Sequence, residues 1–200
     1  MLQKKELLYL YSEKKLSSAD IAKRFACSQG QVDYWLSKYE IQKRSIGDAL
    51  YEKLNPNGDP FKVREPRTVK EGILYGTGIG LYWGEGTKSN KGSIRLGNTD
   101  PRMIRKFIEF LIVFYGIDKR RLRFGLQIFG DMNEEAVIHF WKRALNIPRG
   151  QFHKKIIVTP HRGVGNYRKK TEHGVVTLYF NNRKLRDIIC HAIDEQSLQK

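Results

Sequence analysis

The chain has 200 residues, of which 40% are apolar, so it is long enough to build one or two small domains with real cores. Lysine and arginine outnumber aspartate and glutamate by 37 to 21, and the net charge of +16 predicts a polyanionic partner, usually nucleic acid. The chain contains no run of about 18 uncharged apolar residues and its first residues are charged. We therefore expect no membrane span and no secretory signal, and a cytoplasmic, nucleoid-associated protein.

The N-terminal segment has the pattern of three short helices. A serine at position 17 or 18 is placed to cap the second helix, and Ser28 with Gln31 forms a capping-box pattern that opens the third. Only residues 26–28 separate these two helices. The pair resembles a helix-turn-helix, with Ala26 at the turn position that glycine often holds.

That resemblance implies contacts with DNA from the start of the third helix and from the basic residues that follow it. A glutamine is able to read adenine through two hydrogen bonds, and lysine or arginine pairs with phosphates. The candidate DNA-binding residues of this segment are Gln29, Gln31, Tyr34, Lys38, Lys43 and Arg44. A three-helix protein-interaction domain is the alternative interpretation.

The next stretch has the composition of a linker. Residues 46–71 carry five basic and five acidic residues, and the run 55–60 is a dense turn signal. We expect a linker over residues 45–70. Three apolar residues are able to anchor it on either neighbouring body: Leu50, Leu54 and Phe61.

Four glycines at a spacing of four mark the most unusual segment of the chain. Gly72, Gly76, Gly80 and Gly84 fall near one face of a helix. Each glycine in a helix costs about 1 kcal/mol relative to alanine, so the pattern predicts a close approach of a second helix. Glu85 follows where such a helix should end. We expect a buried helix that carries an acid at its end.

Residues 78–86, GIGLYWGEG, resemble the LAGLIDADG motif of homing endonucleases, in the WGEG form found in small proteins with a helix-turn-helix. Glu85 matches the motif's acidic position, whereas Trp83 replaces its first acid and Gly78 its first leucine. The resemblance implies a homodimer that pairs two such helices through Gly76, Gly80 and Gly84. The alternative is a core helix that happens to end in glutamate.

Alternation and capping signals predict the remaining elements. In order, they are a hairpin over 87–98, a helix from Asp100 to Gly116, a strand over 121–128, a helix over 133–146, strands over 154–159 and 175–180, and a closing helix around 185–193. The expected fold is α+β. Its expected domains are a helix-turn-helix at 1–44, a linker at 45–70 and a LAGLIDADG-like core with a DNA-saddling antiparallel sheet at 71–200. The helix at 133–146 departs from the simplest form of that core.

The strand over 121–128 alternates apolar residues with arginine, glycine and glutamine. Such a strand presents one face to a core and the other to a nucleic-acid groove, although an ordinary solvated face has the same pattern. The candidate DNA contacts of the second domain are Arg95, Arg121, Arg123, Gln127, Arg168 and Lys169.

The chemistry that the resemblance implies is phosphodiester hydrolysis by metal-activated water. Glu85 would be the metal ligand for Mg²⁺ or Mn²⁺, and Lys88 or Lys154 the assisting cation. Because one motif supplies one carboxylate, a working nuclease needs two chains on double-stranded DNA. A DNA-binding transcriptional regulator with a degenerate core is the rival hypothesis. An RNA-binding protein would explain the charge but not the glycine helix.

Overall fold

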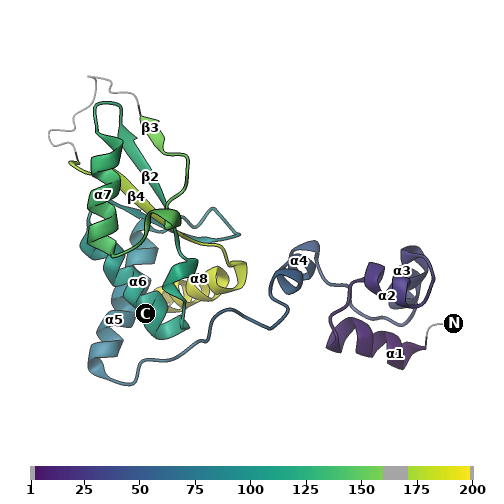
Figure 1. The fold of residues 1–200 in the computed structure, drawn as a ribbon. Coiled ribbons are helices and arrows are strands. Elements are labelled where there is room, and N and C mark those ends of the chain that lie inside the picture. Colours follow the sequence, from purple (N-terminus) through teal and green to yellow (C-terminus); the bar gives the residue numbers. More distant parts are fainter. Residues whose placement is uncertain (1–2, 160–170, 199–200) are drawn as a thin grey trace. The chain divides into compact units, whose positions relative to one another are not determined.

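The computed structural model describes residues 3–159 and 171–198 (Figure 1). The chain divides into two compact units, Met1–Pro60 and Phe61–Lys200. The expected linker is shared between them, because helix α4 lies in the first unit and Phe61 is buried in the core of the second. No helix within the two described ranges is long and apolar enough to cross a bilayer.

The first unit contains the three expected helical segments and one more. Its elements are α1 (Lys4–Leu8), a π-helical turn η1 (Tyr9–Glu13), α2 (Ser18–Arg24), α3 (Gln29–Lys38) and α4 (Ile46–Leu54). The predicted capping box at Ser28 opens α3, and Ser17, one of the two predicted caps of α2, forms a capping box as well. Between these helices Ala26 has a φ of 49°, the left-handed conformation for which glycine is usually needed. Leu7, Ile21, Val32 and Leu36 form the centre of the core of this unit.

Helix α4 was not expected from the sequence. Its start is capped by the side chain of Ser45, which accepts a hydrogen bond of 3.1 Å from the backbone N–H of Asp48. The turn-rich run that suggested a linker lies after the helix. Leu50 and Leu54 are 55% and 70% exposed, so they do not anchor this segment.

The second unit is α+β. Its helices and strands are α5 (Val69–Glu85), β1 (Ile94–Asn98), α6 (Pro101–Tyr115), β2 (Arg123–Phe129), α7 (Glu134–Leu145), β3 (Ile157–Thr159), β4 (Val175–Phe180) and α8 (Arg183–Leu198). Short 3₁₀ turns lie at Lys119–Arg121 (η2) and Arg149–Gln151 (η3). Helix α6 begins as predicted, with Asp100 as its N-cap, and it ends at Gly116, whose φ is 59°.

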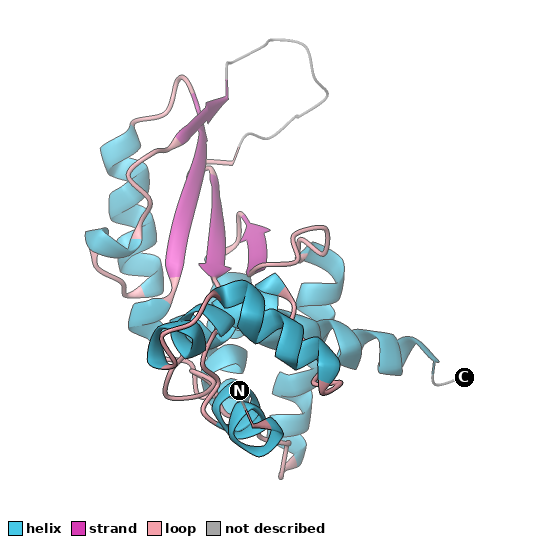
Figure 2. Cartoon of the chain, turned by 90° about the vertical axis from the view of Figure 1, so that its right-hand side faces the viewer, coloured by secondary structure: helices cyan, strands magenta, loops and turns pink. Residues whose placement is uncertain are grey.

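The four strands form one mixed sheet in the order β1-β4-β2-β3 (Figure 2). Strand β4 is antiparallel to both of its neighbours, but β2 and β3 run parallel, so the expected antiparallel sheet is wrong. The reason is α7, which carries the chain back before β3 begins. The expected strand at 87–91 is also wrong. Only a single bridge between Gly86 and Leu96 forms, because the polar residues that follow lack an alternating apolar face.

One face of the sheet is buried, and α5, α6 and α8 contact β1. The buried strand residues are Ile94, Leu96, Phe124, Leu126, Ile128, Val176, Leu178 and Phe180. Tyr82 of α5 is fully buried and stacks on Phe107 of α6, with the ring centroids 5.8 Å apart. The core therefore fixes the end of α5 against the sheet.

Candidate nucleic-acid interface

The C-terminal end of α5 lies beside the edge strand β1. Gly86 forms the bridge with Leu96, and the N–H of Thr87 donates to the carbonyl of Arg95 at 2.9 Å. Glu85, the last residue of α5, is exposed. The fold thus places this carboxylate at one edge of the sheet.

The two cations expected to assist Glu85 have different positions. The ammonium of Lys88 donates to the carbonyls of Tyr82 and Trp83, so it caps the end of α5. Lys154 precedes β3, which is the opposite edge of the sheet from β1. Three interstrand spacings, about 14 Å, separate those edges. Lys154 is therefore not brought to Glu85 within one chain.

The turn after α5 is held by Arg186 of α8, a residue that the sequence analysis did not select as functional. The Nη2 of Arg186 on α8 donates to the carbonyl of Lys88, and the side chain of Arg186 is only 14% exposed. The hydroxyl of Tyr82 contacts the carbonyl of Thr87 at 3.5 Å, and burial raises the pKa of this phenol. The only sequence signal for Arg186 was its place on the closing helix.

The glycine face of α5 is open rather than buried. A Cβ built on Gly72, Gly76, Gly80 or Gly84 would meet no heavy atom within 4 Å. The close approach occurs instead at Gly78, where a Cβ would lie 2.1 Å from the ring of Phe110. The expectation of a buried helix is therefore right for one face only.

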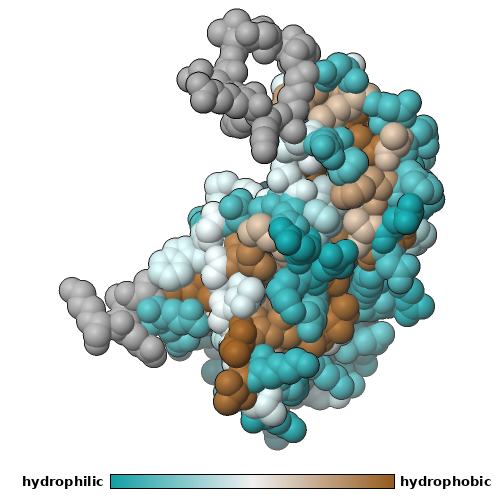
Figure 3. Space-filling view, turned by 90° about the vertical axis from the view of Figure 1, so that its left-hand side faces the viewer, coloured by the Kyte–Doolittle hydropathy of each residue, from teal (hydrophilic) through white to brown (hydrophobic). Residues whose placement is uncertain are grey.

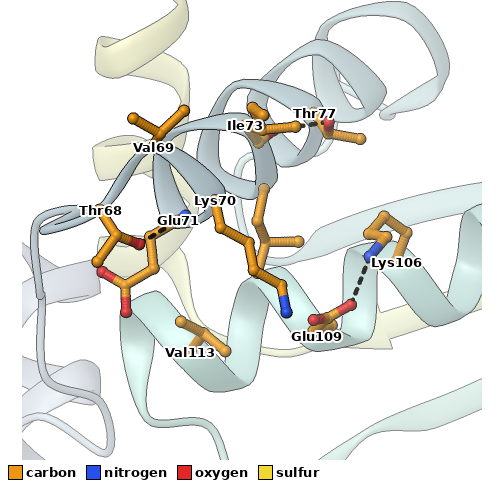
Figure 4. Close-up of a pocket in the computed structure, with 10 residues that line it drawn as sticks. Thr68, Val69, Lys70, Glu71, Ile73, Thr77, Lys106, Glu109 and Val113 are labelled. Atoms are coloured by element: carbon orange, nitrogen blue, oxygen red, sulfur yellow. Dashed lines mark hydrogen bonds and ion pairs between the residues drawn. The ribbon is translucent and has the colours of Figure 1, made fainter.

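Apolar side chains accompany the open glycines. Val69, Ile73 and Trp83 are 83%, 67% and 49% exposed. Beside them, a groove of about 580 Å³ lies between α5 and α6, with Ile73 and Thr77 on one wall and the Lys106–Glu109 ion pair on the other (Figure 4). In the lower part of the view in Figure 3, exposed apolar residues lie between hydrophilic ones.

The face of the sheet opposite the core carries basic residues; we call it the open face. Alternate residues of the strands point to it, and the register aligns them in rows. One row is Arg95, Tyr179 and Arg123, and the next is Gly97, Thr177 and Gly125. No residue of the described strands on this face is acidic.

Three of the four described candidates from the second domain lie on the open face: Arg95, Arg123 and Gln127. The amide of Gln127 donates to Thr159 Oγ1 at 3.0 Å. Arg121 is the exception, because it lies in η2 and its guanidinium is 5.8 Å from the ring of Phe180, a core residue. The expected strand began two residues too early. Arg168 and Lys169 lie outside the described residues.

Both candidate glutamines of helix α3 form hydrogen bonds within the first unit. The amide of Gln29 donates to Ser18 Oγ at 3.3 Å, and Gln31 Oε1 accepts from the N–H of Ser28 at 3.2 Å. Tyr34 is 58% exposed, and the ammonium of Lys38 lies 4.8 Å from a ring centroid of Trp35. Tyr34 and Lys38 are thus the more available candidates on this helix.

The two basic residues after α3, Lys43 and Arg44, differ in exposure and in their contacts within the unit. Lys43 is exposed and lies 4.0 Å from Asp33. Arg44 is 16% exposed, pairs with Glu52, and donates to the carbonyls of Lys15 and Leu16. Its guanidinium is engaged inside the unit, so Arg44 is less available for a phosphate contact than Lys43.

Glu85 satisfies part of the requirement for a divalent cation. Mg²⁺ is commonly held by one or two carboxylates together with substrate phosphates, and the C-terminal end of a helix favours positive charge. Glu85 is an exposed carboxylate at such an end. Among residues 3–159 and 171–198, no group of three histidine, cysteine, aspartate or glutamate side chains is placed to hold a metal.

Comparisons with known protein families, with curated proteins and with solved structures found no match to this chain.

Proposed function

We propose that this protein binds double-stranded DNA as a homodimer and cleaves it in a sequence-specific manner, as a LAGLIDADG-like endonuclease. The observation that carries the proposal is the position of Glu85. This exposed carboxylate ends the glycine helix at the edge of a basic sheet face. Glu85, the acid that the resemblance implies, thus directly precedes the residue that contacts the edge strand of this sheet.

The charge of the open face supports the DNA-binding part of the proposal. Arg95 and Arg123 lie on either side of β4, and no residue of the described strands on this face is acidic. Phosphates of a duplex carry one negative charge for about every 1.7 Å of helix axis, so a surface of this kind attracts them. Tyr34 and Lys38 of α3 would supply contacts from the first unit.

The exposed glycine face of α5 supports the homodimer. Glycine at 76, 80 and 84 lets a second helix approach the backbone closely, and no residue of the described chain covers these positions. A second copy of α5 is an occupant of matching shape. Parallel pairing of the two helices would bring the two Glu85 carboxylates, at their C-terminal ends, towards each other.

A divalent cation bound at Glu85 would activate water and stabilise charge on the scissile phosphate. The chain's own residues have simpler roles in this proposal. Glu85 holds the cation, Arg95 and Arg123 hold the DNA backbone, and Lys88 fixes the end of α5 through its carbonyls. Lys154 is assigned no role beside Glu85 of the same chain.

A DNA-binding regulator that does not cut is the second candidate. Trp83, which is half exposed, occupies the position of the motif's first acid. That position therefore supplies no second carboxylate for a metal. Lys88, the cation nearest in sequence to Glu85, is engaged with helix carbonyls. Both observations favour a core in which the catalytic apparatus has degenerated.

The two candidates are separated by incubating the full chain with a library of duplex targets and Mg²⁺ or Mn²⁺, and scoring retention and nicking together. The nuclease proposal expects retained duplexes to be nicked. Glu85→Gln should abolish nicking while its affinity in EDTA stays unchanged or rises slightly, since one negative charge near the backbone is lost. Glu135→Gln, which changes an exposed carboxylate on α7, is the control and should nick normally.

Wild-type protein that retains a duplex and never nicks it would decide for the regulator. Failure to retain any duplex would contradict both candidates.

A further inference from the structure

Tyr179 lies on the open face, near the end of the inner strand β4, in the row that contains Arg95 and Arg123. Its ring leans over Gly125 of β2, where a Cβ would lie 3.0 Å from Tyr179 Cε2. His153 packs against the ring with the centroids 5.0 Å apart, and the N–H of His153 donates to the carbonyl of Phe124 at 2.8 Å. The ring is therefore held in place by the neighbouring strand and by an anchored histidine.

The guanidinium of Arg95 lies over this ring, with its Cζ 5.4 Å from the centroid. Its Nε donates to Ser93 Oγ at 2.9 Å, and Ser93, which is 3% exposed, donates in turn to Asn90 Oδ1 at 2.9 Å. No carboxylate of the described chain pairs with Arg95. Both terminal nitrogens of Arg95 therefore remain for a ligand.

We propose that Tyr179 is a positioning residue that holds Arg95 as a pre-oriented fork for a DNA phosphate. A planar guanidinium binds phosphate oxygens through two parallel hydrogen bonds, and fixing its plane beforehand lowers the entropy lost on binding. Ser93 fixes one edge of the guanidinium and the Tyr179 ring supports its plane. This inference rests on the proposed DNA binding and applies equally to a nuclease or a regulator.

The hydroxyl of Tyr179 makes no hydrogen bond to the described residues, so the aromatic ring alone does the positioning. Tyr179→Phe should therefore bind DNA like the wild type. Tyr179→Leu keeps an apolar side chain over Gly125 but removes the π face. Because ordering one flexible side chain on binding costs a few-fold in affinity, losing the pre-orientation of Arg95 in Tyr179→Leu should weaken binding about two- to fivefold.

The experiment is a double-mutant cycle on the full chain, with a random-sequence duplex as the probe and titrations at several salt concentrations. Arg95→Ala should weaken binding and flatten the log–log salt slope by about 0.9, one phosphate contact. Tyr179→Leu should leave that slope unchanged, because the charge of Arg95 remains. In the Arg95→Ala background, Tyr179→Leu should have no further effect.

Arg95→Lys gives an independent readout, since it keeps the charge and loses the planar fork. It should weaken binding without changing the salt slope, and Tyr179→Leu should add less to it than to the wild type. Thermal unfolding of each variant checks that the fold is retained.

Additive effects of Tyr179→Leu and Arg95→Ala would overturn the inference, because Tyr179 would then act independently of Arg95. Loss of binding in Tyr179→Phe would overturn it as well and indicate a direct contact from the hydroxyl. A wild type that does not bind the duplex would instead contradict the proposed function itself.

Discussion

Gln31 shows at the scale of single residues why a sequence pattern does not settle a role. The same side chain completes the capping box of α3 and was also a candidate for reading a base. Its Oε1 accepts the N–H of Ser28, whereas a bidentate contact with adenine needs both the oxygen and the nitrogen of the amide. The capping role fixes the orientation of the Gln31 amide and uses one acceptor position of its oxygen, so the amide is less available to a base.

Arg44 is a basic residue whose side chain stabilises the fold of the first unit, although the sequence suggested a role in DNA binding. Its guanidinium lies 4.4 Å from the ring centroid of Tyr11, pairs with Glu52 and binds two main-chain carbonyls. Arg44→Ala should lower the free energy of unfolding of the first unit by about 1–3 kcal/mol, because these partners lose hydrogen bonds to a charged group. The salt slope of DNA binding should not change.

Chemical denaturation of the full chain, read through a probe in the first unit, measures this effect. Lys43→Ala is the matched control, since Lys43 is exposed; it should leave stability nearly unchanged. An Arg44→Ala protein with normal stability and a flatter salt slope would contradict the structural role.

At the scale of elements, α5 presents two different faces. Gly78, Ile79 and Tyr82 are buried against the rest of the unit, whereas Gly76, Gly80 and Gly84 face outwards. A four-residue spacing of glycines does not distinguish a face that packs within the chain from one that packs against another copy. The tertiary contact between Gly78 and Phe110 decides between them, and no local pattern predicts this contact.

The two faces predict opposite effects of substitution. A Cβ at position 80 meets no heavy atom outside its own helix backbone within 4 Å, and leucine is a better helix former than glycine, so the monomer of Gly80→Leu should unfold at the same temperature or higher. The dimer should be lost, because the side chain blocks close approach of the second helix. Gly78→Ala should instead destabilise the monomer, since its Cβ would collide with Phe110.

Thermal unfolding and light scattering at tens of micromolar protein measure these two effects. Wild-type protein that is monomeric both alone and with DNA would contradict the pairing through α5. So would a Gly80→Leu protein that remains dimeric.

The start of β2 gives a second prediction at this scale. Arg123 lies on the open face, whereas Arg121 lies in η2 near a core ring. Arg123→Ala should therefore flatten the salt slope of duplex binding by about 0.9, the value for one phosphate, and Arg121→Ala should change it little. Equal effects of the two substitutions would place both residues against DNA and contradict the assignment of faces.

Local sequence patterns predicted most of the helices and strands. Most features that they did not predict depend on pairing between distant segments. The caps at Ser28 and Asp100 and the alternation in β2 were readable because each depends on residues close in sequence. The parallel pairing of β2 with β3 depends on the path of the chain through α7, which no local pattern specifies. Tyr179 was missed because its partners, Arg95 and His153, come from distant segments.

At the scale of the whole molecule, the excess of positive charge is spread over both units. Residues 1–45 carry nine basic and five acidic residues, and residues 72–200 carry 23 basic and 11 acidic ones. The open face of the sheet and the exposed side of α3 each belong to one of these basic segments. A partner with an extended negative surface is therefore favoured over a compact anion.

Binding of the full-length wild-type chain to duplex DNA over a series of salt concentrations tests the central proposal most directly. We predict tight retention at low salt and a steep loss of affinity as salt rises, with a log–log slope of about −0.9 for each phosphate neutralised. No retention of duplex at low salt, or an affinity that does not depend on salt, would contradict the proposal that this protein binds DNA.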